Sequence, residues 1–545
     1  MIDKARGVAI VRVMKHTIAM VAILSACGYA GLAEVRLPGV IGSDMVLQRN
    51  QPAPIWGWAD AGEQVSLVLR DDGREVEQVD IRANGDGRWR AELAPRPSGG
   101  PYTLTINEHK LAGVMYGEVW LCSGQSNMEW PVMAADAAEM EIAAAHYPDI
   151  RLFHVPKVPA GSPSPDAAAS WQASAPGTIA TFSAVCYYFG RELHSELDVP
   201  VGLIASAWGG TRIEPWTPLA GFRSVEGLGP LADYAVATDA SYRQQLPATL
   251  EAVEAWLADT RAALQSGAPV MPMPQGAHPL AGEEQPTALY NGMIHPLVPY
   301  AIRGALWYQG EANVGDGMSY RDKMEALISG WREVWGQGDF PFYYAQLAPF
   351  DYTFRGMLES RLGMDVSPEY WRALASQFGY EVDPYRLPEI WAAQTAALSI
   401  PNTGMAVTND IGNVGDIHPT NKLEVGRRLS LSALANTYGR TGLEYSGPSY
   451  RSMELRDGAA VLRFDAADGL RTSDGAPPTW FEIAGADGQY VEASAVIEGD
   501  TVVVSSEAVD EPVSARFAWH TRAEPNLVNG AGLPAGAFRT HRPEN

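Results

Sequence analysis

Residues 114–122 are mostly apolar and rich in β-forming side chains, which predicts a buried strand. The small and polar residues 123–127, Ser-Gly-Gln-Ser-Asn, follow at once and predict a sharp turn. Residues 133–145 are rich in Ala, Met and Glu, which favours a helix. A strand, a tight turn and a helix in this order hold a side chain at the carboxyl end of a sheet, and Ser126 is the residue best placed there. On the turn alone, a helix cap is the preferred interpretation of Ser126.

Beyond residue 114 the chain alternates apolar runs with helix-forming stretches. The further candidate strands are 150–155, 201–207, 301–308, 340–347 and 404–408. The candidate helices that separate or follow them are 186–196, 318–335, 390–398 and 422–437. This alternation predicts an α/β domain in which helices cover both faces of a mostly parallel sheet. Ligands of such sheets bind at the carboxyl ends of the strands, so the residues just after each strand are the functional candidates.

On either side of this region the pattern changes to short strands separated by turn residues, which is typical of small β-sandwiches. The chain is therefore expected to divide into a leader over 1–33, an N-terminal β-sandwich over 34–112, the α/β domain over 113–440 and a C-terminal β-rich module over 441–545. Two mostly helical insertions interrupt the α/β domain, near 227–273 and 350–388. They are expected either to form lids or specificity walls, or simply to pack against the domain.

The N-terminal pattern predicts an export signal. Four basic residues precede the apolar run 18–26: Lys4, Arg6, Arg12 and Lys15. The run is short for a membrane span, and the basic-then-apolar order is that of a secretory signal. Leu-Ser-Ala-Cys at 24–27 resembles a lipoprotein cleavage box, which would put a lipid anchor on Cys27, whereas 31–33 is a competing site for ordinary cleavage. The protein is expected to be periplasmic, anchored in the outer membrane or secreted, without an integral membrane span.

Composition narrows the classes of partner. The formal net charge is -24 and the sequence pI ≈ 4.8, which argues against a nucleic-acid or anionic-membrane partner. Clusters of Cys and His with metal-ligand spacing are absent from the sequence, so neither a metal nor another cofactor is expected.

The two cysteines other than Cys27 are Cys122 and Cys186, and both lie in apolar surroundings. Buried free thiols are the preferred interpretation, although a disulfide is chemically allowed in an exported protein. The oligomeric state stays open.

Three further turns after predicted strands carry polar groups that could complete a site around a serine nucleophile. Gly209 and Gly210 follow the strand 201–207, and paired glycines let backbone N–H groups approach a ligand. Asn313 follows the strand 301–308 and could donate a side-chain N–H to an oxyanion. His418 follows the strand 404–408 with Asp416 two positions earlier, and a carboxylate beside an imidazole fixes its tautomer. Each turn alone has a structural explanation, but all of them end strands of one predicted sheet.

Four blocks of the chain resemble the sialate O-acetylesterase family of the SGNH hydrolases: Gly-Gln-Ser-Asn-Met-Glu at 124–129, Trp-Gly-Gly-Thr at 208–211, Trp-Tyr-Gln-Gly-Glu-Ala-Asn at 307–313 and Asp-Ile-His-Pro at 416–419. The resemblance implies a three-layer α/β/α SGNH-hydrolase fold with a flavodoxin-like parallel sheet. It makes Ser126 the nucleophile, His418 the general base and Asp416 the acid that orients the histidine. It also implies an oxyanion hole formed by the Ser126 N–H, Gly210 and Asn313.

The resemblance leaves some roles open. The wider SGNH pattern places its acid three positions before the histidine, where Gly415 stands, so Asp410 is a rival orienting acid. Gln125 and Glu311 lie inside matching blocks and are candidates for support of the loops or for contact with substrate. Arg212 could pair with a sialate carboxylate, but a salt bridge with Glu214 is the preferred role.

The expected function is that of a carbohydrate O-acetylesterase similar to sialate O-acetylesterases. It would remove acetyl groups from sugar hydroxyls through a serine acetyl-enzyme. Its partner would be an O-acetylated carbohydrate. The blocks do not separate sialic acid from plant hemicellulose, either acetyl-xylan or xyloglucan, as the substrate. A non-catalytic carbohydrate-binding protein is the alternative from another class.

Overall fold

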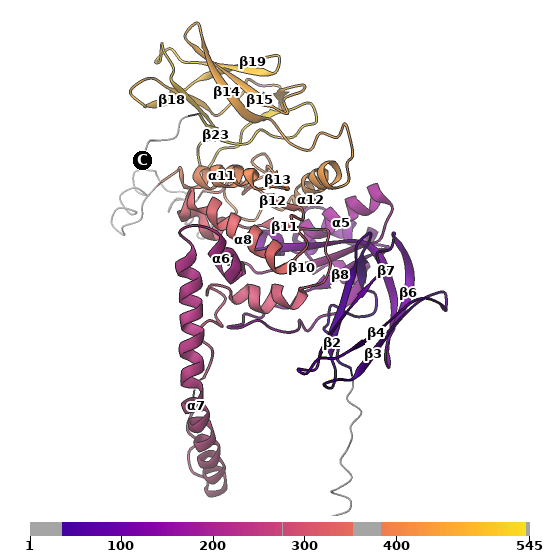
Figure 1. The fold of residues 1–545 in the computed structure, drawn as a ribbon. Coiled ribbons are helices and arrows are strands. Elements are labelled where there is room, and N and C mark those ends of the chain that lie inside the picture. The colour runs from indigo at the N-terminus through magenta and orange to yellow at the C-terminus, as the bar shows by residue number, and fades with distance from the viewer. Residues whose placement is uncertain (1–34, 275, 352–382, 541–545) are drawn as a thin grey trace, which may run out of the picture.

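The computed structural model describes residues 35–274, 276–351 and 383–540. At its centre lies a sheet in the order β13-β12-β11-β7-β10-β8-β9 (Figure 1). The strands are β7 (His109–Gly124), β8 (Tyr147–His154), β9 (Trp171–Ser174), β10 (Val201–Ala207), β11 (Gly304–Tyr308), β12 (Phe342–Ala345) and β13 (Thr403–Ala406). Neighbouring strands are parallel except β8 and β9. The chain order reverses beside β7, which is where such sheets bind ligands.

Helices cover both faces of this sheet. The main ones are α5 (Ala184–Leu197), α6 (Leu219–Ser224), α8 (Ser319–Trp335), α11 (Arg386–Ala396) and α12 (Lys422–Ser432). Trp331 of α8 packs 5.9 Å from the ring of Phe342 in β12. The next residue of β12, Tyr343, faces the other way and stacks 5.9 Å from Trp120 of β7, which also meets Phe189 of α5 at 4.9 Å. Successive strand residues point to opposite faces, so a helix layer lies on each side.

The predicted strands of the α/β domain are confirmed as β7, β8, β10, β11, β12 and β13 in a mostly parallel sheet. The predicted helix over 133–145 differs, because the chain forms a short 3-10 helix, Val132–Ala134, and then α3 (Ala138–Ala144). Ala137 between them has a φ of 55°, a left-handed conformation that interrupts a helix. Much of the predicted, mostly helical insertion near 350–388 lies outside the described residues.

The strand β7 joins the N-terminal β-rich module to the central sheet. Its first half pairs antiparallel with β6, and its second half pairs parallel with β10 and β11. The predicted boundary between residues 112 and 113 therefore falls inside one strand. The other strands of this module are β1 (Val46–Gln48), β2 (Ala53–Trp58), β3 (Gln64–Asp71), β4 (Arg74–Arg82), β5 (Arg88–Leu93) and β6 (Gly99–Ile106).

The C-terminal β-rich module lies beyond α11 and α12, above them in Figure 1. It contains two four-stranded sheets, β14-β15-β20-β19 and β18-β17-β21-β23, and the pair β16-β22. The strands are β14 (Ser449–Arg456), β15 (Ala459–Asp465), β16 (Arg471–Thr472), β17 (Phe481–Ala484), β18 (Tyr490–Glu492), β19 (Ser494–Glu498), β20 (Thr501–Ser505), β21 (Ser514–Phe517), β22 (Leu527–Val528) and β23 (Phe538–Arg539). Asn409 donates its side-chain N–H to the Ala535 carbonyl at 2.8 Å, which ties this module to the loop after β13.

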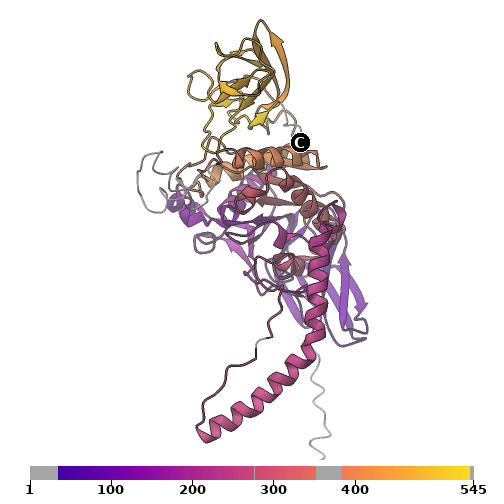
Figure 2. The same cartoon turned by 90° about the vertical axis from the view of Figure 1, so that its left-hand side faces the viewer.

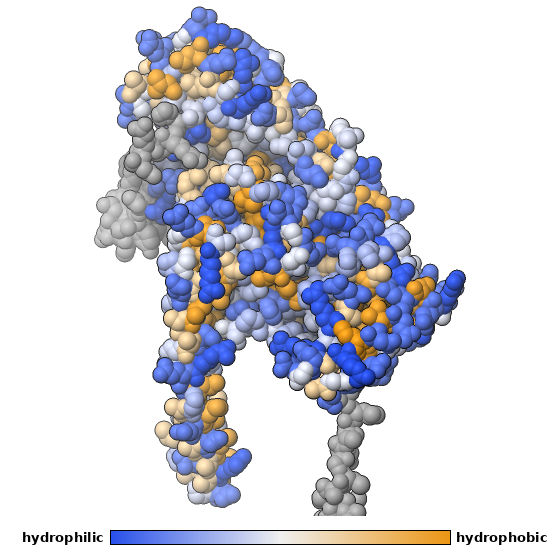
Figure 3. All heavy atoms as spheres, viewed as in Figure 1, coloured by the Kyte–Doolittle hydropathy of each residue, from blue (hydrophilic) through white to orange (hydrophobic). Residues whose placement is uncertain are grey.

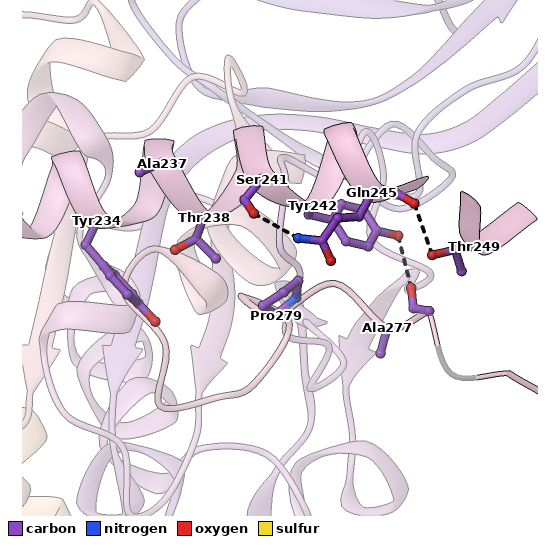
Figure 4. A pocket seen from close by; sticks show the side chains of 10 residues that line it. Tyr234, Ala237, Thr238, Ser241, Tyr242, Gln245, Thr249, Ala277 and Pro279 are labelled. Atoms are coloured by element: carbon purple, nitrogen blue, oxygen red, sulfur yellow. Dashed lines mark hydrogen bonds between the residues drawn. The ribbon is translucent and has the colours of Figure 1, made fainter. Parts of the chain in front are cut away.

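The predicted helical insertion near 227–273 contains α7 (Gly229–Ser266), a long helix that projects from the body of the molecule (Figure 2). Leu250, Leu257 and Leu264 are exposed along it, and apolar colour marks this arm in Figure 3. The chain then returns beside the helix, and the two segments form a pocket whose lining includes Tyr234, Tyr242 and Gln245 (Figure 4). None of the predicted site residues lines it. No helix among the described residues combines the length and apolar character needed to cross a membrane.

Cys122 of β7 and Cys186 of α5 form a disulfide with a Cα–Cα distance of 5.8 Å. The preferred interpretation of two free thiols is therefore wrong. Both residues are fully buried, and they face each other where α5 packs on the central strand, a relation that their separation of 64 residues in sequence does not reveal. The bond links the helix layer to the strand that leads into Ser126.

Removing this disulfide is expected to lower the free energy of unfolding by roughly 2–4 kcal/mol, because closing a long loop restricts the unfolded chain. Denaturant unfolding of the double variant C122A/C186A against the unmodified protein measures the difference. Alkylation of the denatured, unreduced protein provides the control, since neither cysteine should react. Labelling of both cysteines, or equal stabilities, would contradict the pairing.

Candidate active site

Ser126 lies at the turn where β7 ends, as predicted. Gly124 has a φ of 143°, and a Cβ atom on it would lie 2.2 Å from the Tyr308 carbonyl oxygen. Only glycine fits this close approach without displacing the neighbouring strand. The Gln125 N–H donates to the same carbonyl at 3.0 Å. These contacts fix the turn, and α2 (Ser126–Glu129) starts on Ser126 itself.

His418 is the side chain that meets Ser126. Its Nε2 lies 2.9 Å from the Ser126 Oγ, although 292 positions separate the two residues. The imidazole stacks on the ring of Trp130, with centroids 5.0 Å apart and planes inclined by 19°. Burial lowers the pKa of His418 below its usual value, against the opposing effect of Asp416. The ring is therefore neutral near pH 7 and able to accept a proton from the hydroxyl.

The two candidate acids differ in what they contact. Asp416 Oδ1 lies 3.7 Å from Nδ1 of His418 and accepts the His418 backbone N–H at 2.9 Å. Its distance to the ring exceeds that of a direct hydrogen bond, and its side chain is 56% exposed. Asp410 instead accepts two hydrogen bonds from the guanidinium of Arg428, at 2.6 and 2.7 Å. Asp416 is thus the acid on the correct side of the imidazole.

The backbone N–H groups of Ser126 and Gly210, the two predicted backbone donors of the oxyanion hole, make no hydrogen bond to an acceptor among the described residues. Ser126 is the first residue of its helix, where N–H groups lack intrahelical partners. A Cβ on the adjoining Gly209 would lie 3.1 Å from the Ser126 Cβ, so this turn approaches the nucleophile closely. The Gly209 N–H itself donates to Glu129 at 2.7 Å. The Gly209 N–H is therefore engaged, whereas those of Ser126 and Gly210 are free to bind an oxyanion.

Asn313 differs from its predicted role as an oxyanion donor. Its fully buried amide N–H groups donate to Asp316 at 2.6 Å and to Glu214 at 3.2 Å. Its Oδ1 accepts the backbone N–H of Ile213 at 3.0 Å. Both side-chain protons are therefore engaged with carboxylates, and Asn313 holds the loop after β11 against the loop after β10. The motif gave no sign of these two acids as its partners.

Arg212 and Gln125 serve the same loops. The Arg212 guanidinium pairs with Asp316 at 2.9 Å and with Glu214 at 3.1 Å, in line with the preferred salt bridge. The buried Gln125 Oε1 accepts the Gln309 side chain at 3.1 Å and the Ala312 N–H at 3.2 Å. The nucleophile turn is thereby tied to the loop after β11.

Glu311 is buried on the other side of this loop. Its Oε1 accepts a hydrogen bond from Asn127, and burial raises its pKa. Sequence reasoning missed two of the residues around it, Asn127 and Lys422. Lysine is rarely buried, so no pattern marked Lys422 as part of the site, although it lies four positions after His418.

Comparison with known proteins identifies the family of the chain. A family model described as carbohydrate esterase, sialic acid-specific acetylesterase, matches residues 267–369. Sialate O-acetylesterases from Pongo abelii and Homo sapiens are 31% and 30% identical to the chain, and each alignment covers 77% of this chain and 74% of the relative. A crystal structure of a carbohydrate acetylesterase from Xanthomonas citri matches with a TM-score of 0.74 at 32% identity, over 93% of this chain and 100% of that one. The chain therefore belongs to the sialate O-acetylesterase family of carbohydrate esterases.

Proposed function

We propose that this chain removes O-acetyl groups from carbohydrates with Ser126 as its nucleophile. The observation that carries the proposal is the 2.9 Å contact between the Ser126 Oγ and the His418 Nε2. A serine hydroxyl is a weak nucleophile until a neighbouring base takes its proton. A non-catalytic carbohydrate-binding protein has no need of this pair.

In the proposed mechanism the Ser126 Oγ attacks the acetyl carbonyl while His418 takes the hydroxyl proton. The N–H groups of Ser126 and Gly210 stabilise the negative oxygen that develops, as preorganised donors do. His418 then gives its proton to the ester oxygen of the sugar as the bond from that oxygen to the acetyl carbon breaks, so that the sugar leaves with a free hydroxyl and the acetyl group stays on Ser126. Water, deprotonated by the same histidine, releases acetate and restores the serine. Asp416 orients the imidazole and stabilises its cation.

The sugar that bears the acetyl group is the open part of the proposal. The curated relatives are sialate O-acetylesterases, whereas the matched Xanthomonas citri structure is that of a carbohydrate acetylesterase. Arg212 is engaged by Glu214 and Asp316, so it gives no support to binding of a sialate carboxylate. Acetylated hemicellulose is for this reason kept as the second substrate class.

Acetate release from a panel of esters tests the proposal: a chromogenic acetyl ester, O-acetylated sialic acid, acetyl-xylan and acetylated xyloglucan. We expect turnover of the chromogenic ester and of at least one sugar ester, and the highest kcat/KM identifies the substrate class. The de-esterified sugars provide the blank. A folded protein that releases acetate from none of the four would refute the esterase function.

We also infer that the protein is exported, and that a three-layer SGNH-hydrolase domain is flanked by β-sandwich-like modules. The basic-then-apolar order of residues 4–26 supports export. The Cys122–Cys186 disulfide supports it independently, since such bonds persist in oxidising compartments. Mass measurement of the mature N-terminus separates a lipid on Cys27 from ordinary signal cleavage.

A further inference from the structure

Lys422 is a fully buried lysine at the first position of α12. Burial lowers its pKa to about 7. A cation at a helix N-terminus also opposes the helix dipole. Both effects destabilise the charged side chain at this position, so its surroundings must compensate.

The compensating groups belong to the loops that carry Ser126 and His418. The Lys422 ammonium donates a hydrogen bond to the Oδ1 of Asn127, the residue after the nucleophile. The amide group of Asn127 donates in turn to the Glu311 carboxyl and, at 3.0 Å, to the Ile417 carbonyl next to His418. The side-chain polar atoms of Asn127 are thus all paired, and the residue joins the nucleophile turn to the histidine loop.

A second route from Lys422 to the histidine runs through an aromatic ring. The ammonium nitrogen lies 5.7 Å from the centroid of the Trp130 ring and 5.4 Å from that of Tyr308. Cations at such distances are attracted to the faces of aromatic rings. Trp130 is also the ring on which His418 stacks. The same ammonium group therefore donates a hydrogen bond to Asn127 and makes a cation–π contact with Trp130.

We propose that Lys422 is a positioning residue for the esterase reaction: its buried ammonium group, through Asn127 and Trp130, holds the Ser126 turn and the His418 ring in register. The inference rests on the proposed function. Glu311 supplies the carboxyl group that offsets the buried charge. Loss of the ammonium would let two loops shift independently, and misplacement of reacting groups by about 1 Å can cost roughly 10²-fold in rate.

The variants Lys422→Met and Lys422→Gln test this. Met fills a similar volume without charge, and we expect kcat on the chromogenic acetyl ester to fall by about 10- to 100-fold, with KM changed less than about threefold. Gln retains a donor for Asn127 and is expected to lose less kcat. Arg332→Met is the matched control, because Arg332 is a buried cation that donates to the Phe340 and Pro401 carbonyls, just before β12 and β13 at the opposite edge of the sheet.

The pH profile provides a readout that loss of stability does not move. In the wild type, kcat/KM falls as the pH drops through the pKa of His418, which burial holds below its usual value. Asp416 raises this pKa and Lys422 lowers it. Both Lys422 variants should therefore shift the acid limb to higher pH, whereas Arg332→Met should not.

Two results would overturn the role of Lys422 if the wild type is active. One is an acid limb that does not shift in either Lys422 variant, and the other is a loss of kcat in Arg332→Met equal to that in Lys422→Met. If Lys422→Met does not fold, the acid limb of the kcat/KM profile of Lys422→Gln still tests the proposal. An inactive wild type would refute the esterase function instead, so the two failures are distinguishable.

Discussion

Replacing Ser126 with alanine is expected to reduce turnover of an acetyl ester by about 10⁶-fold, the order of loss seen when the nucleophile of a catalytic triad is removed. The substitution removes the Oγ that lies 2.9 Å from the His418 Nε2. Alanine can adopt the conformation of Ser126 at the start of α2, so the fold and the binding of sugar should persist. The free oxyanion donors remain and leave only a small residual rate.

Ser123→Ala is the matched control. Ser123 lies in β7, three positions before Ser126; it is fully buried, and its hydroxyl has no hydrogen-bond partner among the described residues. Its removal should therefore change turnover little. Kinetics of p-nitrophenyl acetate hydrolysis and thermal unfolding are measured for both variants. Retention of more than a few per cent of the activity by a folded Ser126→Ala protein would show that another group is the nucleophile.

The sequence was sufficient to predict the central sheet and the pair formed by Ser126 and His418 at its edge. Parallel strands covered on both faces are continuous apolar runs, so β7, β10 and β11 were visible in the pattern. The carboxyl ends of parallel strands lie at one edge of the sheet, which made Ser126 and His418 candidates for one site, and the resemblance to the esterase family paired them as nucleophile and base. Local pattern and fold class agreed there, which is why the prediction succeeded.

The partners of buried polar groups could not be predicted in the same way. Cys122 and Cys186 pair because a helix packs on a strand, and nothing in the periodicity specifies that register. Asn313 matches a motif position, but its protons go to Asp316 and Glu214, which lie in two different loops. Lys422 was missed because a lysine in a sequence indicates an exposed side chain. Each of these depends on tertiary contacts between distant segments.

Replacing each of the two candidate acids with asparagine should have different effects on kcat, on the pH profile and on stability. Asp416→Asn is expected to lower kcat by about 10²–10³-fold, less than the roughly 10⁴-fold loss for a buried triad acid. The reason is that Asp416 is 56% exposed and 3.7 Å from the ring, so solvent weakens its effect. Because Asp416 raises the pKa of His418, the acid limb of kcat/KM should move to lower pH, the direction opposite to that expected for the Lys422 variants.

Asp410→Asn should give the reverse pattern, with kcat within about threefold of the wild type and a lower stability. Its carboxylate is held by Arg428, whose side chain is 5% exposed, and a buried donor without its partner costs roughly 1–3 kcal/mol. Steady-state kinetics and denaturant unfolding on both variants therefore form a matched pair. A large loss of turnover in Asp410→Asn with wild-type turnover in Asp416→Asn would transfer the orienting role to Asp410. Such a result would require the loop between β13 and α12 to rearrange when substrate binds, since Asp410 is bound to Arg428 rather than to His418 in this structure.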